Sequence, residues 1–292
     1  MEVLVSGLHS YLGRASVSYL PDDGYHVYGL SRDTRLLSYK TNIPITANIT
    51  NVDLIRRGKA YEDFRLDTLD LSFYFTQIPD LDDTIAIRYE LLCLRHFILL
   101  SQRNGCNRII YVGRMYDKYC LEGIKALFVE LQVAYTIVLK DIAIGTDTSF
   151  GRFLTKISAN RYVFLFRPTE RCTFCPFVLE DIFRWIKQIP WKEAFVNEEI
   201  EFGGAQLWEL KDMLVEQAKY LKINNMKRIF SVPNKYAVQL LNQFLYGMRA
   251  DLYDEYIHHI TKGKFADNSK WQSRFSFEFT PILFQPFPPL GV

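Results

Sequence analysis

The chain has 292 residues, of which 49% are hydrophobic and 23% are charged, and its formal net charge is +2. This composition can build a hydrophobic core, so it excludes a disordered chain. The small net charge gives no electrostatic footprint for nucleic acid or an anionic membrane, and no apolar run approaches the ~20 residues that cross a bilayer.

Strands and helices alternate through the first half of the chain. A strand at 3–6 leads through a glycine-containing turn into a helix at 14–20, and a second strand follows at 25–30. This succession has the size of a βαβ unit, whose right-handed crossover makes its two strands parallel. Further strands are predicted at 43–49, 69–75, 108–112 and 134–139, and helices at 52–55, 84–103 and 121–131. The alternation predicts an α/β fold of Rossmann type, with a doubly wound parallel sheet.

The rhythm changes after residue 140. Helices are predicted at 177–189, 206–221 and 235–246, and strands at 194–202 and 228–232. We therefore expect a first domain at 1–145 and a smaller C-terminal lobe for substrate or partner at 146–292, from which some segments return to the first sheet. The tail from residue 275 is rich in Phe and Pro. We expect this tail to be irregular, and it is a candidate contact for an oligomer or a protein partner.

The turn after the first strand resembles a phosphate-binding loop. Helix N-termini attract phosphate, and the dinucleotide form of such a loop uses three glycines: for the tight turn, for the approach of the pyrophosphate and for helix packing. Ser10 stands where the middle glycine would be, so its side chain crowds the pyrophosphate while its hydroxyl could donate to a phosphate oxygen. The alternative is an ordinary strand–helix turn without a ligand. The candidate cofactor-binding residues here are Gly7, Ser10, Tyr11, Leu12 and Gly13.

The end of the second strand bears on the choice of cofactor. An acidic residue there pairs with the ribose 2′-OH of NAD, whereas an Arg accommodates the 2′-phosphate of NADP. The sequence has Ser31 at this position, followed by Arg32. A small neutral residue followed by a guanidinium favours NADP. Asp33 leaves NAD open, because its carboxylate could serve the ribose or neutralise Arg32.

These segments resemble the extended and atypical short-chain dehydrogenases/reductases, a superfamily that includes sugar-nucleotide epimerases and NmrA-like proteins. The matching segments are 6–13, 71–78, 135–140 and 178–182, together with the pair Asn48-Ile49. The resemblance implies a Rossmann-type domain that binds NADP or NAD. It further implies that Asn48 and Ile49 meet the adenine, and that Phe75 and Thr76 lie where the fourth strand enters a cofactor-facing loop.

The same resemblance fails at the residues that carry the family's chemistry. That chemistry depends on a Tyr and on a Lys four residues later, with the Lys charge lowering the pKa of the Tyr, and on a Ser just after the fifth strand. Here Gly113-Arg114 stands in place of the Ser, and Tyr116 is followed at the fourth position by Cys120. Tyr116 with Lys118, or with Lys125, is the remaining candidate catalytic pair. The alternative is that these side chains only line a pocket.

Three functions stay open. The first is an NADP-leaning protein with redox or epimerase chemistry on a small molecule such as a sugar nucleotide. The second is a catalytically silent dinucleotide-binding sensor, regulator or accessory subunit, and the third is a scaffold that has lost the cofactor. No metal site is expected, because Cys172 and Cys175 lack a second close pair of ligands. With no signal peptide visible and an odd number of cysteines, we expect a cytoplasmic protein with reduced thiols.

Overall fold

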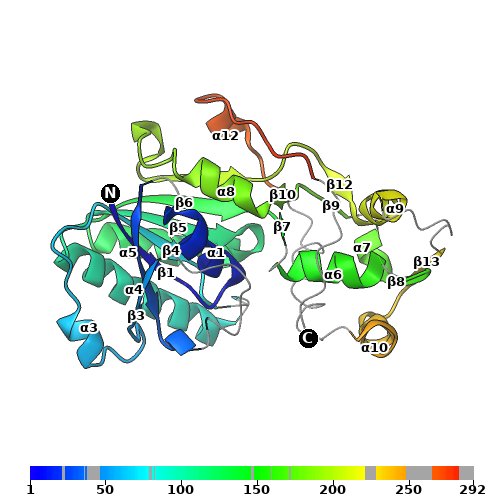
Figure 1. The fold of residues 1–292 in the computed structure, drawn as a ribbon, viewed down its shortest axis with the longest axis horizontal. Coiled ribbons are helices and arrows are strands. Elements are labelled where there is room, and N and C mark those ends of the chain that lie inside the picture. The colour runs from blue at the N-terminus through cyan, green and yellow to red at the C-terminus, as the bar shows by residue number, and fades with distance from the viewer. Residues whose placement is uncertain are drawn as a thin grey trace. The chain divides into compact units, whose positions relative to one another are not determined.

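Two compact units make up the chain (Figure 1). Unit 1 consists of Met1–Lys140 and Ile182–Glu201, and unit 2 consists of Asp141–Asp181 and Phe202–Val292. The predicted strand segment 43–46 and the tail beyond residue 282 lie outside the described residues. The computed structural model describes residues 1–21, 24–35, 37, 47–78, 81, 83–145, 148–158, 160–170, 172–220, 228–247 and 265–282.

A seven-stranded sheet forms the centre of unit 1 within the described residues, in the order β11-β6-β5-β4-β1-β2-β3. Its strands are β1 (Glu2–Ser6), β2 (His26–Ser31), β3 (Asn48–Asn51), β4 (Leu71–Phe75), β5 (Arg108–Arg114), β6 (Ala134–Lys140) and β11 (Glu198–Phe202). The pairs β1–β2, β1–β4, β2–β3, β4–β5 and β5–β6 are parallel. Because the strand order reverses between β1 and β4, the sheet is doubly wound, and the predicted Rossmann-type α/β fold is confirmed.

Helices pack on both faces of this sheet. The helical elements around the sheet are α1 (Tyr11–Tyr19), α4 (Thr84–Arg103), α5 (Leu121–Glu130) and α8 (Leu179–Ile186), with the 3₁₀ turns η2 (Met115–Cys120) and η3 (Glu193–Phe195). A short helix, α3 (Lys59–Asp63), contacts α4, where the Tyr61 hydroxyl donates to His96 O at 2.9 Å. Successive side chains of a strand point to opposite faces. Accordingly, the ring of Tyr74 lies 5.4 Å from Phe97 of α4, whereas the ring of Phe75 lies 6.4 Å from Phe183 of α8. Strand β4 is therefore covered by a helix on each side.

Local hydrogen bonds explain where one predicted helix forms and where another does not. The helix at 84–103 is confirmed, because Asp83 caps it by accepting hydrogen bonds from the backbone N–H groups of Ile85 (2.7 Å) and Ala86 (2.8 Å). The helix predicted at 52–55 is wrong. There the carboxylate of Asp53 accepts from Ile55 N at 2.8 Å, and this bond closes a turn instead.

Unit 2 is built from short elements around its own core. A cluster of buried side chains includes Phe153, Leu165 and Leu214. The strand at 228–232 and the helix at 235–246 are confirmed. The elements are β7 (Ala143–Ile144), α6 (Ser149–Ser158), β8 (Tyr162–Phe166), α7 (Arg167–Glu170), β9 (Thr173–Phe174), β10 (Phe177–Val178), β12 (Trp208–Glu209), α9 (Leu210–Tyr220), β13 (Arg228–Val232), α10 (Lys235–Tyr246) and α12 (Ser269–Gln272).

Several predicted boundaries in the second half are wrong. The helix predicted from 177 begins at Leu179, because Phe177 and Val178 pair with β7 as strand β10. The helix predicted from 206 begins at Leu210, because Trp208 and Glu209 pair with β9. The strand predicted at 194–202 divides into η3 and β11, while α6 and β8 were not predicted. Two-residue strands carry too little sequence pattern to be predicted locally.

The described part of the aromatic tail packs within unit 2. The rings of Phe277 and Phe279 lie 6.2 and 6.0 Å from Phe202, and Phe279 lies 6.0 Å from Trp271. Residues 275–282 form no regular element, as predicted. Their position is fixed by the buried carboxylate of Asp181, which accepts hydrogen bonds from the backbone N–H and the hydroxyl of Thr280 at 3.0 and 2.7 Å. These half-buried and exposed residues therefore pack against their own unit.

Candidate functional site

The turn between β1 and α1 has room only for glycine at two positions. Gly7 adopts a φ of +90°, and a Cβ built on it would come within 2.0 Å of the carbonyl oxygen of Phe75. A Cβ on Gly13 would come within 2.2 Å of the carbonyl oxygen of Gly7. The first and third glycines thus allow a left-handed turn and close packing of the helix on the strand.

Ser10, at the place of the middle glycine, acts as the N-cap of α1. Its hydroxyl accepts a hydrogen bond from Gly13 N at 3.0 Å and donates one to Gly7 O at 2.9 Å. The hydroxyl is therefore committed to the turn itself. An anion at this helix start would bind to backbone N–H groups and to the positive end of the helix dipole.

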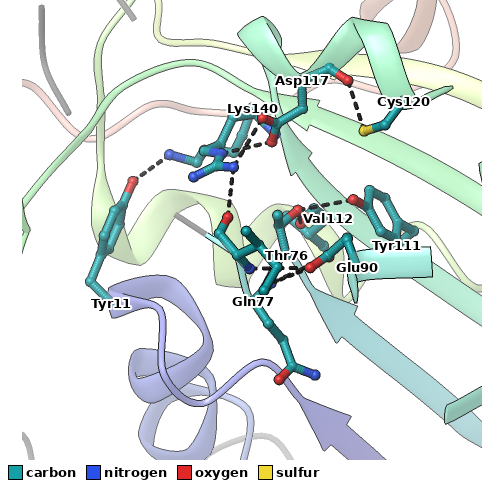
Figure 2. Close-up of polar contacts among 11 residues, drawn as sticks. Tyr11, Thr76, Gln77, Glu90, Tyr111, Val112, Asp117, Cys120 and Lys140 are labelled. Carbon is teal, nitrogen blue, oxygen red and sulfur yellow. Dashed lines mark hydrogen bonds and ion pairs between the residues drawn. The ribbon is translucent and has the colours of Figure 1, made fainter. Parts of the chain in front are cut away.

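Tyr11 and Lys140 meet at the carboxyl edge of the sheet. Tyr11 is the first residue of α1 and is half-buried, and Leu12 beside it is buried. The ammonium of Lys140, the last residue of β6, donates a hydrogen bond to the Tyr11 hydroxyl. Lys140 Nζ also lies 4.9 Å from the centre of the Tyr11 ring. Figure 2 shows the two side chains pointing toward one another from α1 and β6.

The end of β2 carries an exposed guanidinium. Ser31 is buried, and its hydroxyl accepts a hydrogen bond from Asp33 N at 3.2 Å. Arg32 is exposed, and no carboxylate among the described residues forms a salt bridge with it. The Asp33 carboxylate accepts instead from Arg35 N at 3.0 Å. The carboxylate that could have neutralised Arg32 is thus engaged with the backbone.

Strand β3 brings a different residue to this edge from those predicted. Asn48 and Ile49 lie beside Tyr28 and Gly29, three and two residues before β3 ends. The Ile49 side chain packs over Gly29, where an added Cβ would meet it at 2.5 Å. Asn51 was not predicted as a site residue, and it lies beside Ser31 at the carboxyl ends of β2 and β3. The role predicted for Asn48 and Ile49 stays a prediction.

Hydrogen bonds fix the loop that follows β4. Phe75 and Thr76 are both buried. The Thr76 hydroxyl donates to Val112 O at 3.0 Å and accepts from the Tyr111 hydroxyl at 3.1 Å. The Gln77 amide donates to the Ser6 hydroxyl at 3.0 Å, which ties this loop to the end of β1. The loop is therefore held against β5 on one side of β4 and against β1 on the other.

A buried carboxylate beneath this loop was missed in the sequence. Glu90 of α4 is fully buried and accepts hydrogen bonds from Gln77 N (3.2 Å) and Ile78 N (3.1 Å), drawn in Figure 2. Burial raises its pKa from an ordinary value near 4.5 to about 7, although the two N–H groups and the charge of Arg114 oppose the shift. One signal in the sequence could have indicated this buried carboxylate. Glu90 stands four positions before Leu94 and therefore lies on the apolar face of the helix.

Arg114, which with Gly113 stands where the short-chain dehydrogenases/reductases have a Ser, belongs to a buried ion pair. Its Nε and Nη2 atoms donate to the Asp117 carboxylate at 2.6 and 2.9 Å, and Nη2 also donates to Ile78 O at 2.9 Å. The side chains are 11% and 1% exposed. Tyr116 and Lys118 lie on η2, but their side chains lie outside the described part of the structure. Their catalytic role stays a prediction.

The described residues form neither a metal cluster nor a membrane-spanning helix. Across the described ranges, no three His, Cys, Asp or Glu side chains gather as a metal site would require. No helix in the described portion is long and apolar enough to cross a membrane. All five cysteines, which are described, are free thiols.

The fold was compared with known proteins. No protein-family model matches the sequence, and no curated protein matches it. Solved structures do match. A nucleoside-diphosphate-sugar epimerase from Staphylococcus aureus has 14% sequence identity and a TM-score of 0.63, and the match covers 93% of this chain and 95% of that one. The UDP-glucose 4-epimerase of Thermotoga maritima, solved with UDP-glucose, has 13% identity, a TM-score of 0.66 and coverage of 98% and 96%.

A reductase has the same architecture. The triphenylmethane reductase of a Citrobacter species, solved with NADP(H), has 12% identity and a TM-score of 0.69, and the match covers 95% of this chain and 96% of that one. Identities this low carry the fold alone, but the match extends over nearly the whole of each chain. The chain therefore shares the fold of these two epimerases and this reductase.

Proposed function

We propose that the chain binds a nicotinamide dinucleotide at the carboxyl edge of the sheet, with the pyrophosphate at the start of α1. The observation that carries the proposal is the turn from Gly7 to Gly13, in which two glycines permit a close approach of backbone to backbone. Ligands of doubly wound sheets bind where the strand order reverses, and here that point lies between β1 and β4. Several proteins with this fold were solved with NAD or NADP(H).

We further propose a preference for NADP over NAD. Arg32 supports this preference because it is exposed at the end of β2 and follows the small, neutral Ser31. A guanidinium can bind a 2′-phosphate through two parallel hydrogen bonds, whereas the 2′-hydroxyl of NAD offers it no charge. The proposed substrate is a small molecule such as a sugar nucleotide, supported by the UDP-glucose in one of the similar structures.

Fluorescence titration with NADPH and NADH tests the binding. Arg32→Ala is expected to weaken NADPH binding by about tenfold or more, since a hydrogen-bonded charge contributes ~1.5–3 kcal/mol, and to leave NADH within about twofold. Arg95→Ala serves as a control, because Arg95 is an exposed arginine that pairs with Glu130 on the surface. If the wild-type protein binds neither dinucleotide, the proposed function is wrong.

A second function is favoured by Arg114. This residue stands where the family has a catalytic Ser, and Asp117 and Ile78 O engage its guanidinium. Such a chain could bind the cofactor as a silent sensor, regulator or accessory subunit. A screen of sugar nucleotides and small carbonyl compounds, run with the wild type and with Tyr116→Phe, separates the alternatives. Turnover that is unaffected by Tyr116→Phe would remove Tyr116 from the chemistry.

A further inference from the structure

A tyrosine and a lysine from distant parts of the sequence meet at the carboxyl edge of the sheet. Tyr11 begins α1, directly after β1, and Lys140 ends β6. Because β4 and β5 lie between these strands, the two strand ends are three interstrand steps apart, or roughly 14 Å. The two side chains therefore reach toward each other over the ends of β4 and β5, where they form their hydrogen bond.

The environment of this pair suits proton transfer. Lys140 is only 5% exposed, so its ammonium acts on the phenol with little screening by water. An adjacent positive charge favours the phenolate and makes the phenol a better proton donor. Tyr11 is half-buried and part of its surface remains accessible, as a group that must touch a substrate requires.

Three other described side chains at this edge are committed elsewhere. The Tyr111 hydroxyl is fully buried and donates to Thr76. The carboxylate of Glu90 is fully buried and accepts from the backbone N–H groups of the β4 loop. Arg114 is held by Asp117. The Tyr11 phenol is thus a partly accessible acid with a cation bonded to it.

We propose that Tyr11 is the proton donor, and Lys140 its activating cation, in the reduction of a carbonyl substrate; this inference rests on the proposed binding of a nicotinamide dinucleotide. The bound reduced cofactor would supply a hydride. The substrate's carbonyl carbon gains that hydride, and its oxygen takes the phenol proton, so that an alcohol forms. Tyr11 is left as a phenolate beside the Lys140 ammonium and regains a proton from water. One carbonyl, one hydride and one proton give one alcohol, and the oxidised dinucleotide leaves.

The first measurement needs no cofactor. The near-ultraviolet absorbance of phenolate is followed through an alkaline titration of the wild type, Tyr11→Phe and Lys140→Gln. The wild-type curve minus the Tyr11→Phe curve isolates the Tyr11 phenol. Loss of the Lys140 charge in Lys140→Gln is expected to lower the ionisation constant of that phenol by about tenfold. An unchanged constant would overturn the activating role of Lys140.

The second measurement is turnover of 4-nitrobenzaldehyde with NADPH. Tyr11→Phe keeps the aromatic ring but loses the acid, so the turnover number is expected to fall by about 100-fold or more, with NADPH binding retained. Tyr89→Phe, a change at an exposed tyrosine on α4, is the matched control and should leave turnover unchanged. If Tyr11→Phe turns over as fast as the wild type, the catalytic role of Tyr11 is wrong. It is also wrong if the wild type binds NADPH but shows no turnover. Either result leaves the proposed binding of a dinucleotide standing. Absence of NADPH binding overturns the proposed function instead.

Discussion

Replacing Glu90 with glutamine is expected to remove a loss of stability that the wild type suffers as the pH rises. The carboxyl is fully buried, and burial raises its pKa from about 4.5 to about 7. In the unfolded chain the carboxyl regains its ordinary pKa, so the folded state binds more protons between these two values. The stabilisation is fully present below about pH 4.5 and is lost as the pH rises through about 7.

The size of the effect follows from the shift. The pKa rises from about 4.5 to about 7, and a change of one in the pKa corresponds to ~1.4 kcal/mol, so ionised Glu90 costs the folded state about 3–4 kcal/mol. About 2–3 kcal/mol of this cost develops between about pH 5 and about pH 8. Glutamine cannot ionise. Its side-chain oxygen, placed where Glu90 Oε2 lies, still accepts from Gln77 N and Ile78 N.

Urea unfolding at about pH 5 and at about pH 8 measures how much stability the ionisation of Glu90 costs. The free energy of unfolding of the wild type should fall by about 2–3 kcal/mol more than that of Glu90→Gln, because contributions from the remaining titrating groups cancel in the comparison. Glu130→Gln is the matched control. Its carboxyl is exposed, and the hydrogen bond from Arg95 lowers its pKa, so it is ionised throughout this range. If the free energy of unfolding of Glu90→Gln falls between the two pH values as much as that of the wild type, the reasoning is refuted.

Further substitutions test the turn and the buried ion pair by urea unfolding. Ser10→Ala removes the cap of α1 and should cost about 1 kcal/mol, whereas Ser10→Gly should cost only a few tenths; equal costs would contradict the capping role. Gly13→Ala places a methyl group 2.2 Å from a carbonyl oxygen and should cost about 2 kcal/mol or more, whereas Gly58→Ala, with open space at its Cβ, should be nearly neutral. Asp117→Ala leaves Arg114 largely buried without its carboxylate and should cost about 3–5 kcal/mol; a loss below about 1 kcal/mol would show that the pair is dispensable.

The first half of the fold could be predicted because its signals are local. The strands and helices there are long, and the helix at 84–103 has a cap and a glycine stop that the sequence displays directly. The second half uses two-residue strands whose pairing partners are distant in sequence. Phe177 and Val178 form a strand only because β7 lies beside them, and no local pattern contains that information.

The candidate site was predicted in part for the same reason. The places of Gly7 and Gly13 follow from a spacing that the sequence shows. The roles of Ser10 and Glu90 do not, because each depends on which backbone groups the fold brings near. The sequence showed only that Lys140 stands where the short-chain dehydrogenases/reductases have an Arg. Its hydrogen bond with Tyr11 depends on the order of the strands in the sheet.

The place of β11 bears on how the protein is made. This strand covers the β6 edge of the sheet, yet the ribosome synthesises it only after residues 141–197. During translation the β6 edge therefore presents unpaired N–H and C=O groups that another nascent chain could join. A recombinant fragment that stops near residue 145 would keep this edge bare, so aggregation of the fragment would report the missing strand rather than a failure of the Rossmann-type fold.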